Sequence, residues 1–569
     1  MNSIGPLTLL TALPIAGAVL VLILKRAQKL SRAVAIVIAV AALLATLVLW
    51  ARFDSAAPGM QFQEVHTWAP SVGLTYHVGV DGLGILLLVL SAVVVLMSLA
   101  ASWRNASHGP VYFALVLLLE AGLFGTFTAL NFLHWFIFWE LTLLPAFFLV
   151  RLWGGPQRGR ASVQFFFYTM VGSVALLLAF LALYLATGTY DFTTLAQMAQ
   201  NGGLAAALQQ NLHWGGWSGG HIALILFWAV FLGFAVKTPV VPFHGWLPDT
   251  YSEASSETTM LLTGAMSKMG IFGFLRILLP IFPAQMQEML TPLLWLAVAS
   301  IVLPAFAAWR QKDLKRTFAY SSVNHLGYCV LGVCVAAKLT GVDPSLAIEK
   351  SAALTGVLLQ IFSHGLTAAA LFWFVALLER RSGGLRGLED FGGLRKIVPV
   401  FCGLMGIAIF ASLGLPGLNG FPAEFLIFKG AFPLAGWAAT AALLGLLLTA
   451  VFLLGILQKV FFGPLGKGQL ETKTDTNSSS LPAAMRDLST TERFALAPAI
   501  ALMFVLGLYP QLIAGKMAGT VTQWTTPATS ATEAFKTTAP KHNAARLEAA
   551  SGAWLIHRKA QAGKAQVAD

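Results

Sequence analysis

The sequence has little charge for its length. Only 11% of its 569 residues are Asp, Glu, Lys or Arg, whereas 57% are hydrophobic. A soluble chain of ordinary composition carries about 25% charged residues, so this composition excludes a soluble globular protein and indicates a polytopic membrane protein. The net charge of +12 comes from basic residues gathered in short loops, where they set membrane topology. We therefore expect no nucleic-acid partner.

Cysteine is also scarce, and the motifs of soluble redox enzymes are missing. Cys329, Cys334 and Cys402 lie in apolar runs, and no spacing suits zinc or an Fe–S cluster. No Rossmann glycine fingerprint, P-loop or haem-attachment motif is present. These absences predict a chain that binds neither a metal nor a redox cofactor, and whose cysteines are small buried side chains.

Long apolar runs make up most of the chain. A membrane-spanning helix needs about 20 apolar residues, and alternate loops between the runs are basic, as alternating topology requires. This register predicts that both termini lie on the outer face. We expect about fourteen spanning helices, near residues 4–24, 33–51, 82–103, 111–130, 131–151, 164–187, 222–242, 258–280, 289–309, 317–337, 353–378, 398–428, 433–462 and 494–514.

Two of these runs are interrupted by Gly and Pro. In the seventh, Lys237 is followed by Thr238-Pro239 and then Pro242, so the helix must break or kink there. The twelfth contains SLGLPGLNGFPAE. Interrupted helices at corresponding positions of two repeats mark the binding sites of transporters. The two interrupted runs are five helices apart. Because a repeat of five helices crosses the membrane an odd number of times, the next repeat starts on the opposite side. The sequence therefore predicts an all-α fold with two inverted five-helix repeats and discontinuous helices 7 and 12.

These repeats divide the chain. We predict N-terminal helices with an outer hairpin, two repeats, an inner loop with the last span, and a polar tail. The tail has no further spanning run, and its segment 541–559 forms either a short amphipathic helix or no fixed structure. The predicted boundaries are 1–110 (hairpin within 52–80), 111–280, 281–462, 463–514 and 515–569.

Ionisable residues inside the apolar runs are the candidates for function. Glu140 lies alone in HWFIFWELTLLP, where a carboxylate is costly unless it is protonated or paired. Lys237 is its expected partner. A nearby carboxylate keeps a lysine charged, and their separation favours release of a proton. The alternative is a purely structural ion pair.

Four further residues extend the row. Lys268 lies near mid-span among small residues, and His325 and His364 follow on later helices. Histidine titrates near neutral pH and can relay protons. Glu424 follows the interruption of the twelfth run and is expected to release protons on the outer side. Three further residues are expected to have secondary roles. His244 would act as a gate, Glu120 would tune the region around Glu140, and Lys429 would be an interfacial anchor.

Several motifs resemble one family. KTPVVPFHGWLPDTYSEAS is similar to the signature of the proton-translocating antiporter-like subunits of respiratory complex I, and other matches extend over about residues 80–510. Among those paralogues the chain looks most like the M type, because Glu424 stands where the N type has lysine. The other matching motifs are FWELTLLP, QKDLKRTFAYSSVNHLGY, FSHGLTAAALF and LGLPGLNGFPAEFLIFKG.

The resemblance implies a function. It implies a subunit of NADH:quinone oxidoreductase in a bacterial inner membrane, with L-type and N-type paralogues as partners. NADH, FMN, Fe–S clusters and quinone would bind to other subunits. It also implies a proton path through catalytic groups on this chain, driven by redox chemistry elsewhere. That path comprises Glu140, Lys237, Lys268, His325, His364 and Glu424.

The sequence departs from the family at four positions. Tyr251 replaces a histidine, Ser255 a proline, Gln164 a lysine and Asn131 an aspartate. The lysine missing at Gln164 helps to tune the Glu–Lys pair in the family. Three alternatives remain open at the level of sequence: a cation/proton antiporter subunit, a subunit of a membrane-bound hydrogenase, and a structural scaffold without transport.

Overall fold

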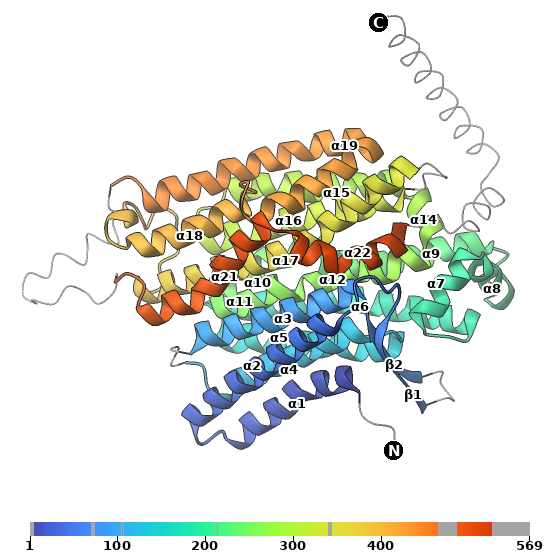
Figure 1. Ribbon diagram of the computed structural model, residues 1–569, viewed down its shortest axis with the longest axis horizontal. Coiled ribbons are helices and arrows are strands. Elements are labelled where there is room, and N and C mark those ends of the chain that lie inside the picture. The colour runs from blue at the N-terminus through green and yellow to red at the C-terminus, as the bar shows by residue number, and fades with distance from the viewer. Residues whose placement is uncertain are drawn as a thin grey trace, which may run out of the picture.

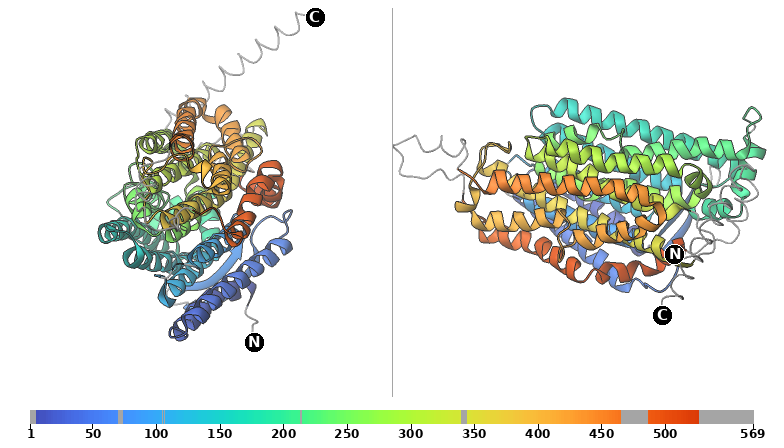
Figure 2. Two further views of the ribbon diagram at one scale, coloured as in Figure 1. Left: turned by 90° about the vertical axis from the view of Figure 1, so that its left-hand side faces the viewer. Right: turned by 90° about the horizontal axis from the view of Figure 1, so that it is seen from above.

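The computed structural model is a bundle of helices lying along one axis, with the two ends of the bundle built differently (Figures 1 and 2). Residues 465–485 of the predicted inner loop and the segment 541–559 lie outside the described part. The structure describes residues 5–69, 74–103, 105, 107–212, 214–338, 344–464 and 486–525.

Within these residues, thirteen helical segments are long and apolar enough to cross a membrane. One of them, Ser256–Ile281, joins several helical pieces. The others are α1 (Pro6–Ile23), α2 (Gln28–Arg52), α3 (Gly82–Ser102), α4 (Pro110–Thr128), α5 (Phe132–Trp153), α6 (Arg158–Thr187), α9 (Gly219–Lys237), α15 (Leu290–Trp309), α16 (Leu314–Ala337), α17 (Pro344–Arg381), α19 (Gly420–Ile456, continued by the π-helix η5, Leu457–Phe461) and α21 (Thr490–Leu508).

The predicted count of about fourteen spans is confirmed. The backbone of α19 is non-helical at Ala435. This residue divides α19 into the second part of the twelfth span and the thirteenth span. The first part of the twelfth is the shorter apolar helix α18 (Pro399–Ser412). Before α19 begins, Gly414 and Gly417 have φ of +78° and +91°, a conformation that only glycine adopts without strain.

The seventh and eighth spans are also irregular. Helix α9 ends at Lys237, and after a turn the chain resumes as α10 (Trp246–Glu253). Both interruptions thus fall where Pro and Gly predict them, five spans apart. The eighth span alternates α- and π-helix, an irregularity often found at functional sites. Its pieces are α11 (Ser256–Leu261), η2 (Leu262–Met266), α12 (Lys268–Gly273), η3 (Phe274–Leu278) and α13 (Leu279–Ile281).

One end of the bundle carries the basic loops. They are tied to each other by ion pairs, with Arg316 to Asp249 at 2.8 Å and Arg386 to Asp313 at 2.6 Å. The opposite end carries the predicted hairpin, β1 (Gln61–Ala69) and β2 (Leu74–Val80), paired antiparallel. The short helices are α7 (Phe192–Gln200), α8 (Gly203–Asn211), α14 (Pro283–Glu288), the 3-10 turn η4 (Leu394–Lys396) and α22 (Gln511–Thr525).

The hairpin is held by charge at two places. Glu64 accepts hydrogen bonds from the start of α1, and His77 contacts Asp191 at 2.6 Å. Burial alone would raise the pKa of Asp191, but hydrogen bonds from His77 and Thr193 lower it to about 2. The hairpin therefore joins α1 to the loop before α7 at physiological pH.

Polar side chains are concentrated in the centre of the bundle. The membrane-spanning windows of the Ser256–Ile281 segment and of α17 are wholly buried, whereas only 28% of the windows of α2 and α21 is buried. Large apolar side chains on α2, α6, α19 and α21 face outward, as expected of helices in contact with lipid. Lys237, Lys268, His325, His364 and Glu424 thus lie where other helices, rather than lipid, surround them.

Candidate functional site

Lys268 stands at the centre of the ionisable groups. Its ammonium Nζ donates to the carbonyl oxygen of Thr263 at 2.5 Å and lies 2.8 Å from His364 Nδ1. The π-helical turn explains the first contact, because Ser267 N bonds to Leu262 O, five residues back. This leaves the carbonyl of Thr263 to accept from side chains. Lys268 is fully buried, so these bonds replace its hydration.

His364 and His325 connect Lys268 to the second interrupted helix. Their rings stack with centroids 5.3 Å apart and planes at 21°. His325 Nδ1 lies 2.7 Å from the carbonyl of Ser321, and its Nε2 lies 2.9 Å from the carbonyl of Ser412. A carbonyl oxygen only accepts, and a neutral imidazole has one N–H. Two facing carbonyls therefore suit the doubly protonated ring, so His325 is placed to hold a proton.

Glu424 ends the series. Its Oε1 lies 3.7 Å from His325 Nε2, and the residue is 5% exposed. The interruption allows this approach, because a Cβ on Gly414 would lie 2.7 Å from Glu424 Oε2. Gln360, one turn before His364 on α17, lies beside the carboxyl group. Lys268, His364, His325 and Glu424 thus form a continuous row, here called the output row.

Lys237 and Glu140 are arranged differently. Lys237 Nζ lies 4.8 Å from the centroid of the Trp139 ring, a cation–π contact. Glu140 is near enough to act electrostatically on Lys237, but no ion pair within 4.0 Å joins these two described residues. No described group hydrogen-bonds the buried Oε1 of Glu140. The structure therefore shows this predicted pair apart, with an aromatic ring at the lysine.

The end of α9 packs tightly against the eighth span. A Cβ on Gly270 would lie 1.9 Å from Thr238 Oγ1, and one on Gly273 would lie 2.4 Å from the Phe234 ring. Lys237, at the end of α9, is therefore held close to α12, the helix that begins with Lys268. Among the described contacts, none joins the two lysines directly. We call Glu140 and Lys237 the input pair.

The secondary candidates lie away from these groups. His244, after the end of α9, faces Tyr320 with ring centroids 6.5 Å apart. Lys429, which is exposed on α19, forms an ion pair of 3.5 Å with Glu349, as suits an interfacial anchor. Glu120 is fully buried, and neither of its oxygens has a hydrogen-bond partner among the described residues. Among these residues there is also no cluster of three metal-ligating side chains.

Sequence reasoning missed the residues that position the histidines. Asn419, at the start of α19, is hydrogen-bonded to Ser363 and Thr367 on either side of His364. Asn324, which precedes His325, donates to Ile301 O at 2.7 Å and accepts from Thr449. For Asn324, an amide beside a histidine in an apolar helix was the available signal, because a buried amide needs partners on other helices.

Comparison with known proteins places the chain and its fold in one family. The transmembrane profile of the NADH:quinone oxidoreductase/Mrp antiporter family matches residues 129–449. The chain belongs to this family. The matched part includes the input pair and the whole output row, so both lie in the portion that defines this antiporter-like subunit.

Individual relatives cover nearly the whole subunit. It is 35% identical to NADH-quinone oxidoreductase subunit M of Rhodobacter capsulatus, over 89% of this chain and 94% of the relative. It is also 35% identical to F(420)H(2) dehydrogenase subunit M of Methanosarcina mazei, over 83% and 88%. A chain of respiratory complex I from Thermus thermophilus superposes with a TM-score of 0.74 at 26% identity, covering 92% of this chain and 100% of that one.

Proposed function

We propose that this subunit moves protons across the membrane for an NADH:quinone oxidoreductase, driven by redox chemistry in other subunits. The output row supports this proposal most strongly. Lys268, His364, His325 and Glu424 follow one another within 2.8 to 5.3 Å between neighbours, inside the bundle. A purely structural role does not explain such a series, because burying each ionisable group costs free energy.

Proton transfer through the output row follows from the contacts. Lys268 as an ammonium gives the proton on Nζ to His364 Nδ1 and becomes a neutral amine. The stacked rings do not point their nitrogens at each other, so transfer to His325 requires one ring to turn or a water to intervene. From His325 Nε2 the proton passes to the carboxylate of Glu424, 3.7 Å away, after a small side-chain movement.

The input pair supplies Lys268. When the Glu140 carboxylate approaches Lys237, it favours the ammonium form; when it withdraws, Lys237 more readily gives up a proton. Trp139 keeps the lysine in place while the carboxylate moves. A conformational change transmitted from partner subunits would set the position of Glu140.

The setting of the subunit is part of the proposal. We expect L-type and N-type antiporter-like paralogues beside it, in the inner membrane of a bacterium. NADH, FMN, Fe–S clusters and quinone would be held by partner subunits and would supply electron transfer. This chain would contribute only proton translocation, and its enzyme activity would be that of the complex.

Three variants test the proposal in the purified complex, reconstituted in liposomes with assembly assayed in parallel. Glu140→Gln, Lys237→Ala and Glu424→Gln should each assemble and lower the rate of proton pumping severalfold, because each variant removes a proton-transfer group. Lys429→Gln is the matched control, because Lys429 lies on α19 near Glu424 but forms an exposed pair. Normal pumping by all three variants would refute the relay.

Two observations bear on the alternatives. The family includes Mrp antiporters, and one relative belongs to an F(420)H(2) dehydrogenase. An antiporter role predicts sodium-dependent proton movement in vesicles without any electron donor. The complex I role predicts pumping only during NADH oxidation. Measuring pumping with NADH, with reduced F(420) and with a sodium gradient alone separates the three.

A further inference from the structure

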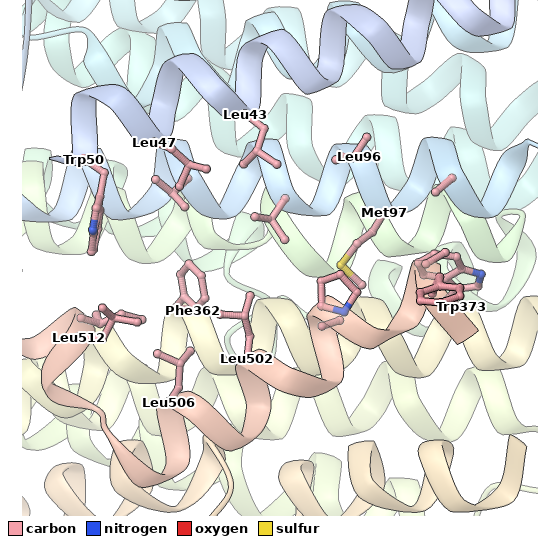
Figure 3. A pocket seen from close by; sticks show the side chains of 18 residues that line it. Leu43, Leu47, Trp50, Leu96, Met97, Phe362, Trp373, Leu502, Leu506 and Leu512 are labelled. Carbon is pink, nitrogen blue, oxygen red and sulfur yellow. The ribbon is translucent and has the colours of Figure 1, made fainter. Parts of the chain in front are cut away.

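An apolar cleft separates the N-terminal from the C-terminal helices. It has a volume of about 690 Å³, and its walls are α2 and α3 on one side and α21 and α22 on the other (Figure 3). All 18 lining residues are apolar, and Phe362 and Trp373 of α17 line its inner side. The labelled residues that show the two walls best are Leu43, Leu47, Leu96, Met97, Leu502 and Leu506.

This cleft continues toward the basic end of the bundle. A second cavity of about 380 Å³ shares Ala100, Trp373 and Ala495 with it, so the two adjoin each other. Along α2 the combined lining extends from Ala33 to Trp50, a rise of roughly 26 Å at 1.5 Å per residue. The cleft therefore follows the helices over most of a hydrocarbon core of about 30 Å.

Positive charge gathers where the cleft reaches the basic end. Arg380 lines this mouth and is exposed; its Nε donates to Ala376 O, and no carboxylate of the described residues pairs with it within 4.0 Å. The carboxylate there, Glu492, is bound by Arg381 at 2.7 Å. Burial, followed by the charges of Arg380 and Arg32, lowers the pKa of nearby His108 to about 3. Arg380 is thus the cationic group of the cleft lining that has no ion-pair partner among the described residues.

We propose that the cleft binds one anionic phospholipid, with its acyl chains along the apolar walls and its phosphate at Arg380. Guanidinium groups bind phosphate oxygens in pairs, and basic pockets between spanning helices bind anionic headgroups. Trp103 and Trp373 line the mouth, and indoles prefer the headgroup level of a bilayer. Apolar walls and a cationic mouth match the two parts of such a lipid.

A helix from a neighbouring subunit fits less well. A helix about 10 Å wide that followed the cleft for roughly 26 Å would need on the order of 2,000 Å³. The two cavities along this length offer about 690 Å³ and 380 Å³. Walls from both ends of one chain therefore enclose a space suited to flexible acyl chains rather than to a folded segment. The lipid would link α21 and α22 to the N-terminal helices.

Photolabelling of the intact complex tests this site without turnover, so its result is independent of proton pumping. The complex is placed in phosphatidylcholine nanodiscs that contain a probe lipid with a diazirine in one acyl chain. The probe is either phosphatidylglycerol, which is anionic, or phosphatidylcholine, which is zwitterionic. We expect the anionic probe to label peptides of α2, α17 and α21 in preference to the zwitterionic probe. Arg380→Gln should lower that labelling about tenfold, as loss of a charge-assisted contact would.

Two controls keep the result interpretable. Arg160→Gln removes another exposed arginine, on α6, and should leave labelling unchanged. Ala499→Trp fills the cleft and should abolish labelling, which tests the site even if Arg380→Gln fails to assemble. Its control is Leu178→Trp on the exposed face of α6, which should leave labelling unchanged. Equal labelling by the two probes, labelling unaffected by Ala499→Trp, or cross-links to a partner subunit's helix within the cleft would each overturn the proposal.

Discussion

The input pair and the output row differ in how their members are connected. From Lys268 to Glu424, each group lies against the next, on helices buried by their neighbours. Glu140 is only half-buried on α5, and Lys237 faces a tryptophan ring rather than a carboxylate. The output row is assembled in this conformation, whereas the input pair is separated.

This difference shows which part of the subunit needs to move. Asn419 and Asn324 pin the helices that carry the two histidines, so the output row keeps its spacing while protons pass. The input pair has no comparable hydrogen bonds in the described structure, and its partners meet only if α5 or the end of α9 shifts. Coupling to other subunits is therefore expected at the input pair.

The largest effect on proton pumping is expected at Lys268, the member of the output row that would receive protons from the input pair. Lys268→Met keeps a side chain of similar length but carries no proton, so pumping should fall by about tenfold or more. Lys268→Arg sharpens the comparison, because arginine keeps its charge and does not release a proton in proteins. In liposomes, both variants should lose most of their proton pumping although the complex assembles. Normal pumping by Lys268→Arg would show that Lys268 provides only a fixed charge.

The next effect concerns the spacing of the output row. Gly414→Ala places a Cβ 2.7 Å from Glu424 Oε2 at a φ of +78°, a backbone strain of about 1–2 kcal/mol. We expect pumping to fall severalfold as Glu424 is pushed from His325. Gly403→Ala on α18 is the control, because a Cβ there meets no atom within 4 Å. Equal behaviour of the two variants would mean that the close approach of Glu424 is unimportant.

A smaller effect is expected at the input pair. Trp139→Leu removes the ring beside Lys237, a contact worth about 2 kcal/mol when shielded from water, and should slow pumping two- to threefold. The indole also donates to Ser173 Oγ at 3.1 Å. Ser173→Ala removes that bond but keeps the ring, so it should pump normally. A loss in Ser173→Ala as large as in Trp139→Leu would assign the effect to the position of the helix.

The smallest effect is expected beside the first interruption. Burial lowers the pKa of His244 below its usual value, against a weaker raising effect from the Pro242 backbone. The ring is therefore neutral above about pH 6.5, and protonation would begin only at lower pH. His244→Gln should leave the pH profile of pumping unchanged between pH 6.5 and 8. A profile displaced in that range would make His244 a titrating gate.

The spans, their interruptions and the identities of the six ionisable groups were predictable from sequence. Apolar runs of sufficient length must become helices in a bilayer, because each backbone polar group needs an internal partner. Pro242 and Gly414 lie at the breaks that their chemistry predicts. The predicted inclusion of Lys268, His325, His364 and Glu424 in one row agrees with their contacts, although its part in transport stays a prediction.

The contacts and orientation of these groups were not predictable. Lys268 meets His364 and the Thr263 carbonyl only because a π-helical turn precedes it, and turns of this kind have no clear sequence signature. His325 faces two carbonyl oxygens because α18 ends beside α16. Such contacts arise between residues up to 96 positions apart in the sequence, so local propensity carries no information about them.

The sequence alone determined that this protein spans a membrane, where its helices break and which charges it buries, since each follows from the free energy of placing a residue type in lipid. The tertiary structure alone decided that Glu140 and Lys237 stand apart while Lys268 reaches Glu424 through two histidines. Proton transfer depends on distances of a few ångströms, and the packing of helices against one another sets those distances.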